Sequence, residues 1–145
     1  MLRIKQCPVY VINLNCAKER MESMDTQLSK IGIHYERIAA VKGINLTDEQ
    51  VKQEYSETLN KKYFRADLSL GEIGCYISHK NIWRKMVTEN IEYAVILEDD
   101  MILERDFIKL FSLTDTLKQY ELIKLADNRK HTPKHVKELD QDFEL

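Results

Sequence analysis

Short apolar segments with strand character alternate with segments of helical periodicity along this chain of 145 residues. Residues 8–14 (PVYVINL), 33–41 (IHYERIAAV), 93–97 (YAVIL) and 121–126 (ELIKLA) are short and largely apolar, which predicts four strands. Strands that are separated by helices pair in parallel, because each helix carries the chain back across the sheet. The sequence therefore predicts an α/β fold in which helices flank a mainly parallel sheet.

Three longer helices are expected between the strands. Residues 17–31 place apolar side chains on one face, and Gly32 would end that helix. Thr47 and Gln50 have the spacing of a capping box, which predicts a polar surface helix to about residue 59, followed by a loop over 59–68. The apolar face of the first helix consists of Met21, Met24, Leu28 and Ile31.

Ser69 and Glu72 form a second capping-box pattern, which begins a helix that should run to about residue 89. Residues 104–111 suggest a further short helix. Residues 127–145 are polar and weakly patterned, so we expect no strand there and divide the chain into a domain at 1–126 and a polar tail at 127–145. The buried side of the helix after Ser69 is expected to consist of Ile73, Tyr76, Ile77, Trp83 and Val87.

Composition argues against several classes of protein. The net charge is −2 and the basic residues are scattered, so a nucleic-acid partner is not expected. The three cysteines, at irregular spacing, form neither a disulfide framework nor a CxxC zinc pattern. No apolar run approaches the roughly 20 residues that span a bilayer, and the N-terminus does not read as a signal peptide. We therefore expect a soluble protein of the reducing cytoplasm.

Three consecutive acids, Glu98, Asp99 and Asp100, follow the predicted strand at 93–97. Ligands of parallel sheets gather at the carboxyl ends of the strands, where these acids would repel one another unless a cation intervenes. Carboxylates suit Mg²⁺ or Mn²⁺, and residues 98 and 100 face the same way on an extended strand. The alternative is a solvated acidic loop that caps the helix beginning near Glu104.

The segment LGEIGCYISHKNIW, residues 70–83, carries Gly71 and Gly74 inside a helix, where each costs up to about 1 kcal/mol relative to alanine. This cost indicates either close approach by a backbone or ligand, or a loosely capped helix start. Ser78 and His79 are adjacent and project about 100° apart, so they do not form a nucleophile–base pair by adjacency. A structural role is the simpler interpretation of His79, and a core position is expected for Cys75.

Asn13 ends the first predicted strand, and Arg20 follows in the first turns of the next helix. Both could face the same sheet edge as the acids, and arginine suits phosphate. A surface charge on the helix is the alternative for Arg20.

Three segments, in this order and spacing, together resemble glycosyltransferase family 25, the lipopolysaccharide and lipooligosaccharide galactosyltransferases and their collagen-modifying relatives. VYVINLNCAKERMESMDTQLSKIGIHYERIAAVKG resembles the opening strand–helix–strand of the family. LSLGEIGCYISHKNIWRKMV resembles its central Gly-Glu-x-(Gly/Ala)-Cys-x-x-Ser-His helix, and YAVILEDDMIL resembles its acidic motif. Typical members continue beyond residue 126, so the chain resembles an N-terminal portion or a short member, truncated at its C-terminus.

The resemblance implies a Rossmann-like fold of the GT-A type and an inverting hexosyltransferase, with galactose as the expected sugar. A UDP-sugar would be the donor and a lipid-linked lipopolysaccharide or lipooligosaccharide the acceptor. Glu98 and Asp100 would hold Mn²⁺ or Mg²⁺ as a DxD-like motif. The resemblance assigns no residue as the catalytic base. The residues expected to bind the donor are Asn13, Arg20, Gly71, Glu72, Ser78, His79, Glu98 and Asp99.

Two other functions remain open at this point. A truncated relative could bind a sugar nucleotide without catalysis, or serve as a partner module whose open sheet edge pairs in a homodimer. An active enzyme would work in the cytoplasm, at the inner face of the membrane if it associates peripherally. A phosphate-accepting receiver domain also clusters acids at strand ends, but it needs acids after the first strand, where this chain has Asn13, Leu14 and Asn15.

Overall fold

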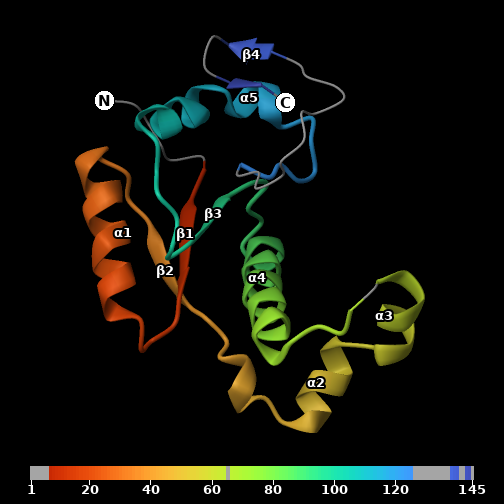
Figure 1. Ribbon diagram of the computed structural model, residues 1–145. Helices are drawn as coiled ribbons and strands as arrows, with labels where there is room; N and C mark the ends of the chain where they lie inside the picture. Colours follow the sequence, from red (N-terminus) through yellow and green to blue (C-terminus); the bar gives the residue numbers. More distant parts are fainter. Residues whose placement is uncertain (1–6, 65, 126–137, 141–142, 145) are drawn as a thin grey trace. The chain divides into compact units, whose positions relative to one another are not determined.

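A computed structural model describes residues 7–64, 66–125, 138–140 and 143–144. The chain divides into two compact units, Pro8–Ile102 and a second unit made of Met1–Cys7 with Leu103–Leu145. In the larger unit, three parallel strands are ordered β2-β1-β3 (Figure 1). The α/β, Rossmann-like prediction is confirmed.

Strand β1, Val9–Asn13, is the central strand and is buried at all five positions. Such a continuous apolar run is typical of parallel strands whose two faces are both covered. Its neighbours are β2, Glu36–Ala39, and β3, Val95–Glu98. Asn13 pairs with Ala39, and Ile12 pairs with Glu98, so the carboxyl ends of the three strands meet at one edge of the sheet.

Helices α1, Lys18–Lys30, and α4, Leu70–Thr88, lie on opposite sides of the sheet (Figure 1). Tyr10 and Ile12 form a core cluster with Ile82 of α4. Because side chains alternate along a strand, Val9 and Val11 face the other side, the side of α1, where Met24 and Leu28 are buried. The predicted helix over 17–31 is confirmed, and Gly32 ends it with a φ of +68°.

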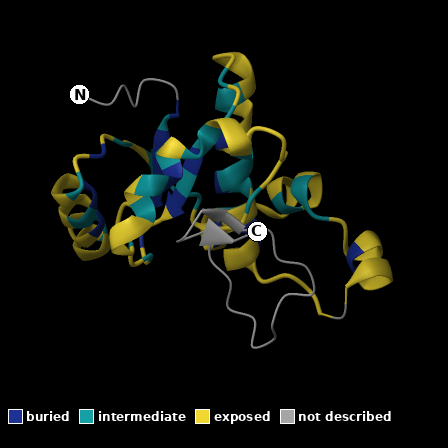
Figure 2. Cartoon of the chain, turned by 90° about the horizontal axis from the view of Figure 1, so that it is seen from above, coloured by how far each residue is buried: buried dark blue, intermediate teal, exposed yellow. Residues whose placement is uncertain are grey.

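The region between β2 and α4 differs in part from the prediction. A short 3-10 turn, η1, covers Gly43–Asn45, and the capping box at Thr47 opens α2, Asp48–Glu54, as expected. The helix does not continue to residue 59, and a separate helix α3 covers Glu57–Tyr63. The predicted loop over 59–68 is therefore wrong for residues 59–63, whereas residues 64 and 66–68 lie outside helices and strands as predicted. Ser56 begins it by accepting a hydrogen bond from the Leu59 N–H. Both helices are largely exposed (Figure 2).

The capping box of Ser69 and Glu72 is confirmed, but the predicted buried side of α4 is largely wrong. Ile73 is buried, whereas Tyr76 and Trp83 are each 42% exposed and Val87 is 83% exposed. The buried residues of α4 also include a row at intervals of four positions. Two of its members are small, because the helix packs there against the backbone that follows β2. This row consists of Gly74, Ser78 and Ile82.

The second unit contains a 3-10 helix η2, Arg105–Ser112, and a short helix α5, Thr114–Leu117. Strands β4, Glu138–Asp140, and β5, Phe143–Glu144, pair antiparallel, so the expectation that the tail adds no strand is wrong. The strand predicted at 121–126 is also wrong over residues 121–125, and residue 126 lies outside the described part. The domain division at residue 126 stays a prediction. Among the described helices, none has the length and apolarity to cross a membrane.

Candidate functional site

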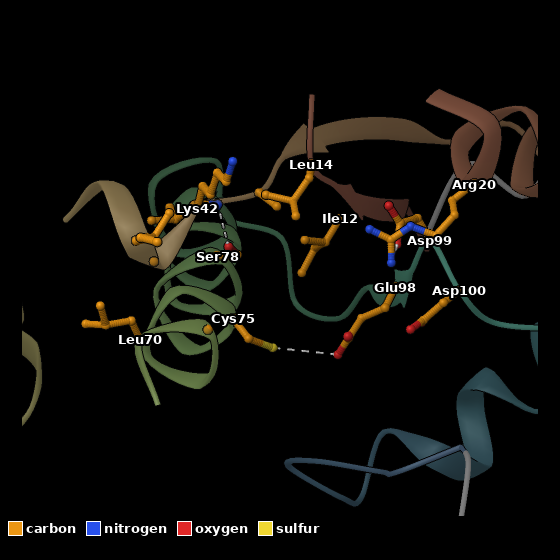
Figure 3. A pocket seen from close by; sticks show the side chains of 15 residues that line it. Ile12, Leu14, Arg20, Lys42, Leu70, Cys75, Ser78, Glu98, Asp99 and Asp100 are labelled. Atoms are coloured by element: carbon orange, nitrogen blue, oxygen red, sulfur yellow. Dashed lines mark hydrogen bonds and ion pairs between the residues drawn. The ribbon is translucent and has the colours of Figure 1, made fainter. Parts of the chain in front are cut away.

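A cavity of about 420 Å³ opens at the carboxyl edge of the three-stranded sheet. The ends of β1 and β3, the segment after β2 and the first turns of α4 supply its walls (Figure 3). Open parallel sheets bind ligands at this edge, at the point where the strand order reverses; here β2 and β3 lie on either side of β1. The lining residues are Ile12, Leu14, Arg20, Ala40, Val41, Lys42, Gly43, Ile44, Leu70, Gly71, Cys75, Ser78, Glu98, Asp99 and Asp100.

Asp99 is held inside this edge rather than presented to solvent. The residue is 8% exposed, and its carboxylate accepts a hydrogen bond of 2.5 Å from the Asn13 amide. Its other oxygen lies 3.2 Å from Nη1 of Arg20. The predicted proximity of Asn13, Arg20 and the acids is therefore present. A direct role of these residues in binding a ligand stays a prediction.

Arg37 completes this polar group, and sequence reasoning missed it. Its Nε donates a hydrogen bond of 2.8 Å to Oδ1 of Asn13, and its Nη2 donates to Oδ1 of Asn15 at 2.7 Å. The Asn13 amide also donates to the Ala17 carbonyl at 2.9 Å, which ties the end of β1 to the start of α1. Nothing in the linear sequence pairs Arg37 with Asn13, since only the register of β1 and β2 brings them together.

Glu98 and Asp100 differ from the acid between them. Both are exposed and line the cavity, and in Figure 3 their side chains point away from the Arg20–Asp99 pair. Asp100 makes no hydrogen bond or ion pair with any other residue that the structure describes. Two exposed carboxylates beside an open cavity fit a hard divalent cation, which takes oxygen ligands and keeps several water molecules.

Cys75 and His79 lie one helical turn apart on α4, close to Glu98. The Cys75 sulfur is 3.8 Å from Oε1 of Glu98, and Nε2 of His79 is 3.9 Å from the same oxygen. Cys75 is exposed, so its predicted core position is wrong. Partial burial of the thiol group, followed by the negative charge of Glu98, raises the pKa of Cys75 above its ordinary value.

The two glycines of α4 have different surroundings. A Cβ on Gly74 would lie 2.6 Å from the Val41 carbonyl oxygen and 2.8 Å from the Gly43 nitrogen, so a backbone does approach closely there. A Cβ on Gly71 would meet only the Ser69 hydroxyl, at 3.7 Å, and Gly71 therefore stands at the cavity wall without a comparable contact.

Ser78 and Glu72 are engaged within the protein. The buried Ser78 hydroxyl accepts a hydrogen bond of 2.8 Å from the Val41 N–H and donates to the Gly74 carbonyl at 2.7 Å. The Glu72 carboxylate accepts from the Ser69 N–H at 2.7 Å, and this bond, with the Ser69 hydroxyl, holds the pKa of Glu72 below its ordinary value. These contacts position the cavity wall, and binding of a ligand by either residue stays a prediction.

The family model described as "Glycosyltransferase family 25 (LPS biosynthesis protein)" matches residues 6–142. This chain belongs to glycosyltransferase family 25. The resemblance inferred from the three sequence segments is thereby confirmed.

Several curated members of family 25 are similar to this chain. A glycosyltransferase 25 family member of Drosophila melanogaster is 32% identical over 128 residues, which cover 83% of this chain and 21% of that protein. Procollagen galactosyltransferase 2 of Homo sapiens is 32% identical over 118 residues, covering 79% of this chain and 19% of that protein. A family member of Aedes aegypti is 34% identical over 102 residues, or 68% of this chain and 17% of that protein. The chain thus spans about a fifth of the length of these relatives.

Proposed function

We propose that this family 25 chain binds a UDP-sugar together with a divalent metal and transfers a hexose, galactose, from it to a lipopolysaccharide or lipooligosaccharide acceptor. The arrangement of the three acids carries the proposal. Asp99 is fixed between Asn13 and Arg20, whereas Glu98 and Asp100 remain exposed at the cavity. The family description supports the acceptor class, and relatives named procollagen galactosyltransferases support galactose as the sugar.

Glu98 and Asp100 are the residues proposed to hold Mn²⁺ or Mg²⁺. When bound, the ion supplies Lewis-acid stabilisation of the charge that develops on the leaving diphosphate. Arg20 lines the same cavity, with its side chain 46% exposed, so its guanidinium can also contact a phosphate while one nitrogen holds Asp99. Lys42, exposed in the cavity wall after β2, adds a second cation there.

The remaining residues of the site position the reacting groups. Asn13, buried and bonded to Arg37, Ala17 and Asp99, fixes the direction in which the chain leaves β1 and β3. Ser78 holds the segment after β2 against α4, and Gly74 permits that close packing. His79 stands beside Glu98, with its Nε2 3.9 Å from Oε1.

In the proposed reaction the acceptor hydroxyl oxygen forms a bond to the anomeric carbon from the face opposite UDP. The bond between that carbon and the diphosphate oxygen breaks, UDP leaves, and the hydroxyl proton passes to a general base. The configuration at the anomeric carbon is thereby inverted.

A transfer assay tests this function. The protein is incubated with Mn²⁺, labelled UDP-galactose and either lipooligosaccharide or a collagen peptide. We expect galactose on the lipooligosaccharide, with transfer strongly reduced by Asp100→Asn and unchanged by Asp48→Asn, a matched exposed acid on α2. Label on the collagen peptide alone would overturn the acceptor class. Donor binding without transfer to either acceptor would favour the non-catalytic module.

A further inference from the structure

Three side chains of different chemistry converge beside the cavity: the Cys75 thiol, the His79 imidazole and the Glu98 carboxylate. Each offers one metal-ligating atom, and the three atoms lie within 4.8 Å of one another. Cys75 and His79 are four residues apart on α4 and therefore share one face of the helix, while Glu98 ends β3. Two rigid elements thus supply the cluster.

The imidazole is oriented as a metal ligand requires. Nδ1 of His79 lies 3.1 Å from the Cys75 carbonyl oxygen, which can only accept, so the tautomer that carries its ring proton on Nδ1 can donate to it. Nε2 then carries the lone pair, and it faces Oε1 of Glu98 at 3.9 Å. Metal-bound histidines commonly donate their second ring N–H to a backbone carbonyl in this way.

We propose that Cys75, His79 and Glu98 bind a thiophilic divalent metal, with Zn²⁺ as the best fit, and leave a fourth position open to water. Around tetrahedral Zn²⁺, sulfur, nitrogen and oxygen ligands are roughly 3.3–3.6 Å apart, given bonds of about 2.0–2.3 Å. The Cys75 sulfur is 3.8 Å and Nε2 of His79 is 3.9 Å from Oε1 of Glu98, and the three ligand atoms lie within 4.8 Å of one another. Side-chain movements of up to roughly 1.5 Å would bring them to the tetrahedral separations. The thiol proton is released to solvent when the sulfur binds the metal.

This site is distinct in chemistry from the metal site of the proposed function and does not depend on it. A thiolate and an imidazole select Zn²⁺ and similar ions, whereas carboxylates alone suit Mg²⁺ and Mn²⁺. Glu98 is common to both sets, and Cys75 and Glu98 both line the cavity. Zn²⁺ at this cluster would therefore compete with a hard cation held by Glu98 and Asp100, which makes the cluster a candidate inhibitory site.

The test uses the whole chain, without nucleotide, and Co²⁺ as a spectroscopic substitute for Zn²⁺. We expect Co²⁺ to give a near-ultraviolet band of thiolate-to-metal charge transfer, which added Zn²⁺ abolishes by displacement. Cys75→Ser should eliminate this band. Cys75→Ser and His79→Gln should each raise the Kd for Zn²⁺ at least 10-fold, the lower end of the range for losing a supporting contact of a metal site. Cys16→Ser is the matched control, since Cys16 is also an exposed thiol, and should change neither quantity.

Circular dichroism of each variant establishes that it is folded before the metal titration. Absence of the charge-transfer band in the unaltered protein would overturn the proposal. So would a folded Cys75→Ser variant that retains the band, or loss of the band in Cys16→Ser. None of these results bears on UDP binding, so the failure of this site and the failure of the proposed transferase function are separate outcomes.

Discussion

Adjacent acids on this chain have different environments, and their contacts explain the difference. Asp99 is buried and accepts from Asn13, while Glu98 and Asp100 remain exposed on the cavity side. The sequence located the acids at the end of a strand and predicted that Asn13 and Arg20 could face the same edge. It could not predict which acid turns inward, because that depends on the register that places Asn13 and Arg37 beside the turn.

Removal of the Asp99 carboxylate should destabilise the fold more than removal of its cationic partner. Asp99→Ala leaves a buried amide N–H of Asn13 without its acceptor, which should lower the free energy of unfolding by about 1–3 kcal/mol. Arg20→Ala should lower it by less than about 1 kcal/mol, since the Arg20 side chain is 46% exposed. Urea denaturation of both variants measures the difference. Equal losses in the free energy of unfolding of the two variants would contradict a stabilising role for the buried Asp99 carboxylate.

The reactivity of Cys75 reports on the charge of Glu98. Partial burial, then the Glu98 carboxylate, raises the pKa of Cys75, and at a pH below that pKa a higher value means less thiolate. Glu98→Gln should therefore lower the pKa and speed alkylation of Cys75 by roughly 2- to 10-fold at pH 8 in the presence of a chelator. Mass spectrometry of the Cys75 peptide follows the rate. Glu92→Gln, an exposed acid before β3, should have no effect.

At the scale of elements, sequence signals predicted helix ends correctly where the contacts that set those ends lie within one short segment. The capping boxes at Thr47 and Ser69 and the glycine after α1 fix helix ends through their own backbone contacts. The buried face of α4 was mispredicted because packing against a backbone favours small residues over large apolar ones. Gly74 and Ser78 are buried, but a prediction of the buried face from the spacing of large apolar residues does not include glycine or serine.

The contact between α4 and the segment after β2 should not tolerate a larger residue at position 74. In Gly74→Ala the new Cβ would lie 2.6 Å from the Val41 carbonyl oxygen, so we expect a loss of about 1–3 kcal/mol in the free energy of unfolding. Gly71→Ala is the matched control: its Cβ meets only the Ser69 hydroxyl at 3.7 Å, and alanine favours a helix by up to about 1 kcal/mol. Thermal unfolding compares the pair. A neutral Gly74→Ala would refute the close packing.

At the scale of the whole molecule, the α/β class and the family were predictable from the sequence, because alternating strands and helices and three spaced motifs carry them. The second unit was predicted less well. Residues 121–125 form no strand, and β4 and β5 lie within the segment expected to lack strands. Short strands in polar segments depend on pairing partners more than on their own composition, which limits prediction from pattern alone.

The cavity is formed where the ends of three strands, the start of α4 and two exposed carboxylates lie together. Calorimetric titration of UDP into the protein, with and without Mn²⁺, tests most directly whether this edge is a metal-assisted nucleotide site. We predict binding that requires Mn²⁺ and that Asp100→Asn weakens about 10-fold or more, equivalent to about 1.4 kcal/mol, while Asp48→Asn leaves it unchanged. UDP binding that is equally strong without metal, or that is absent in both conditions, would contradict the account.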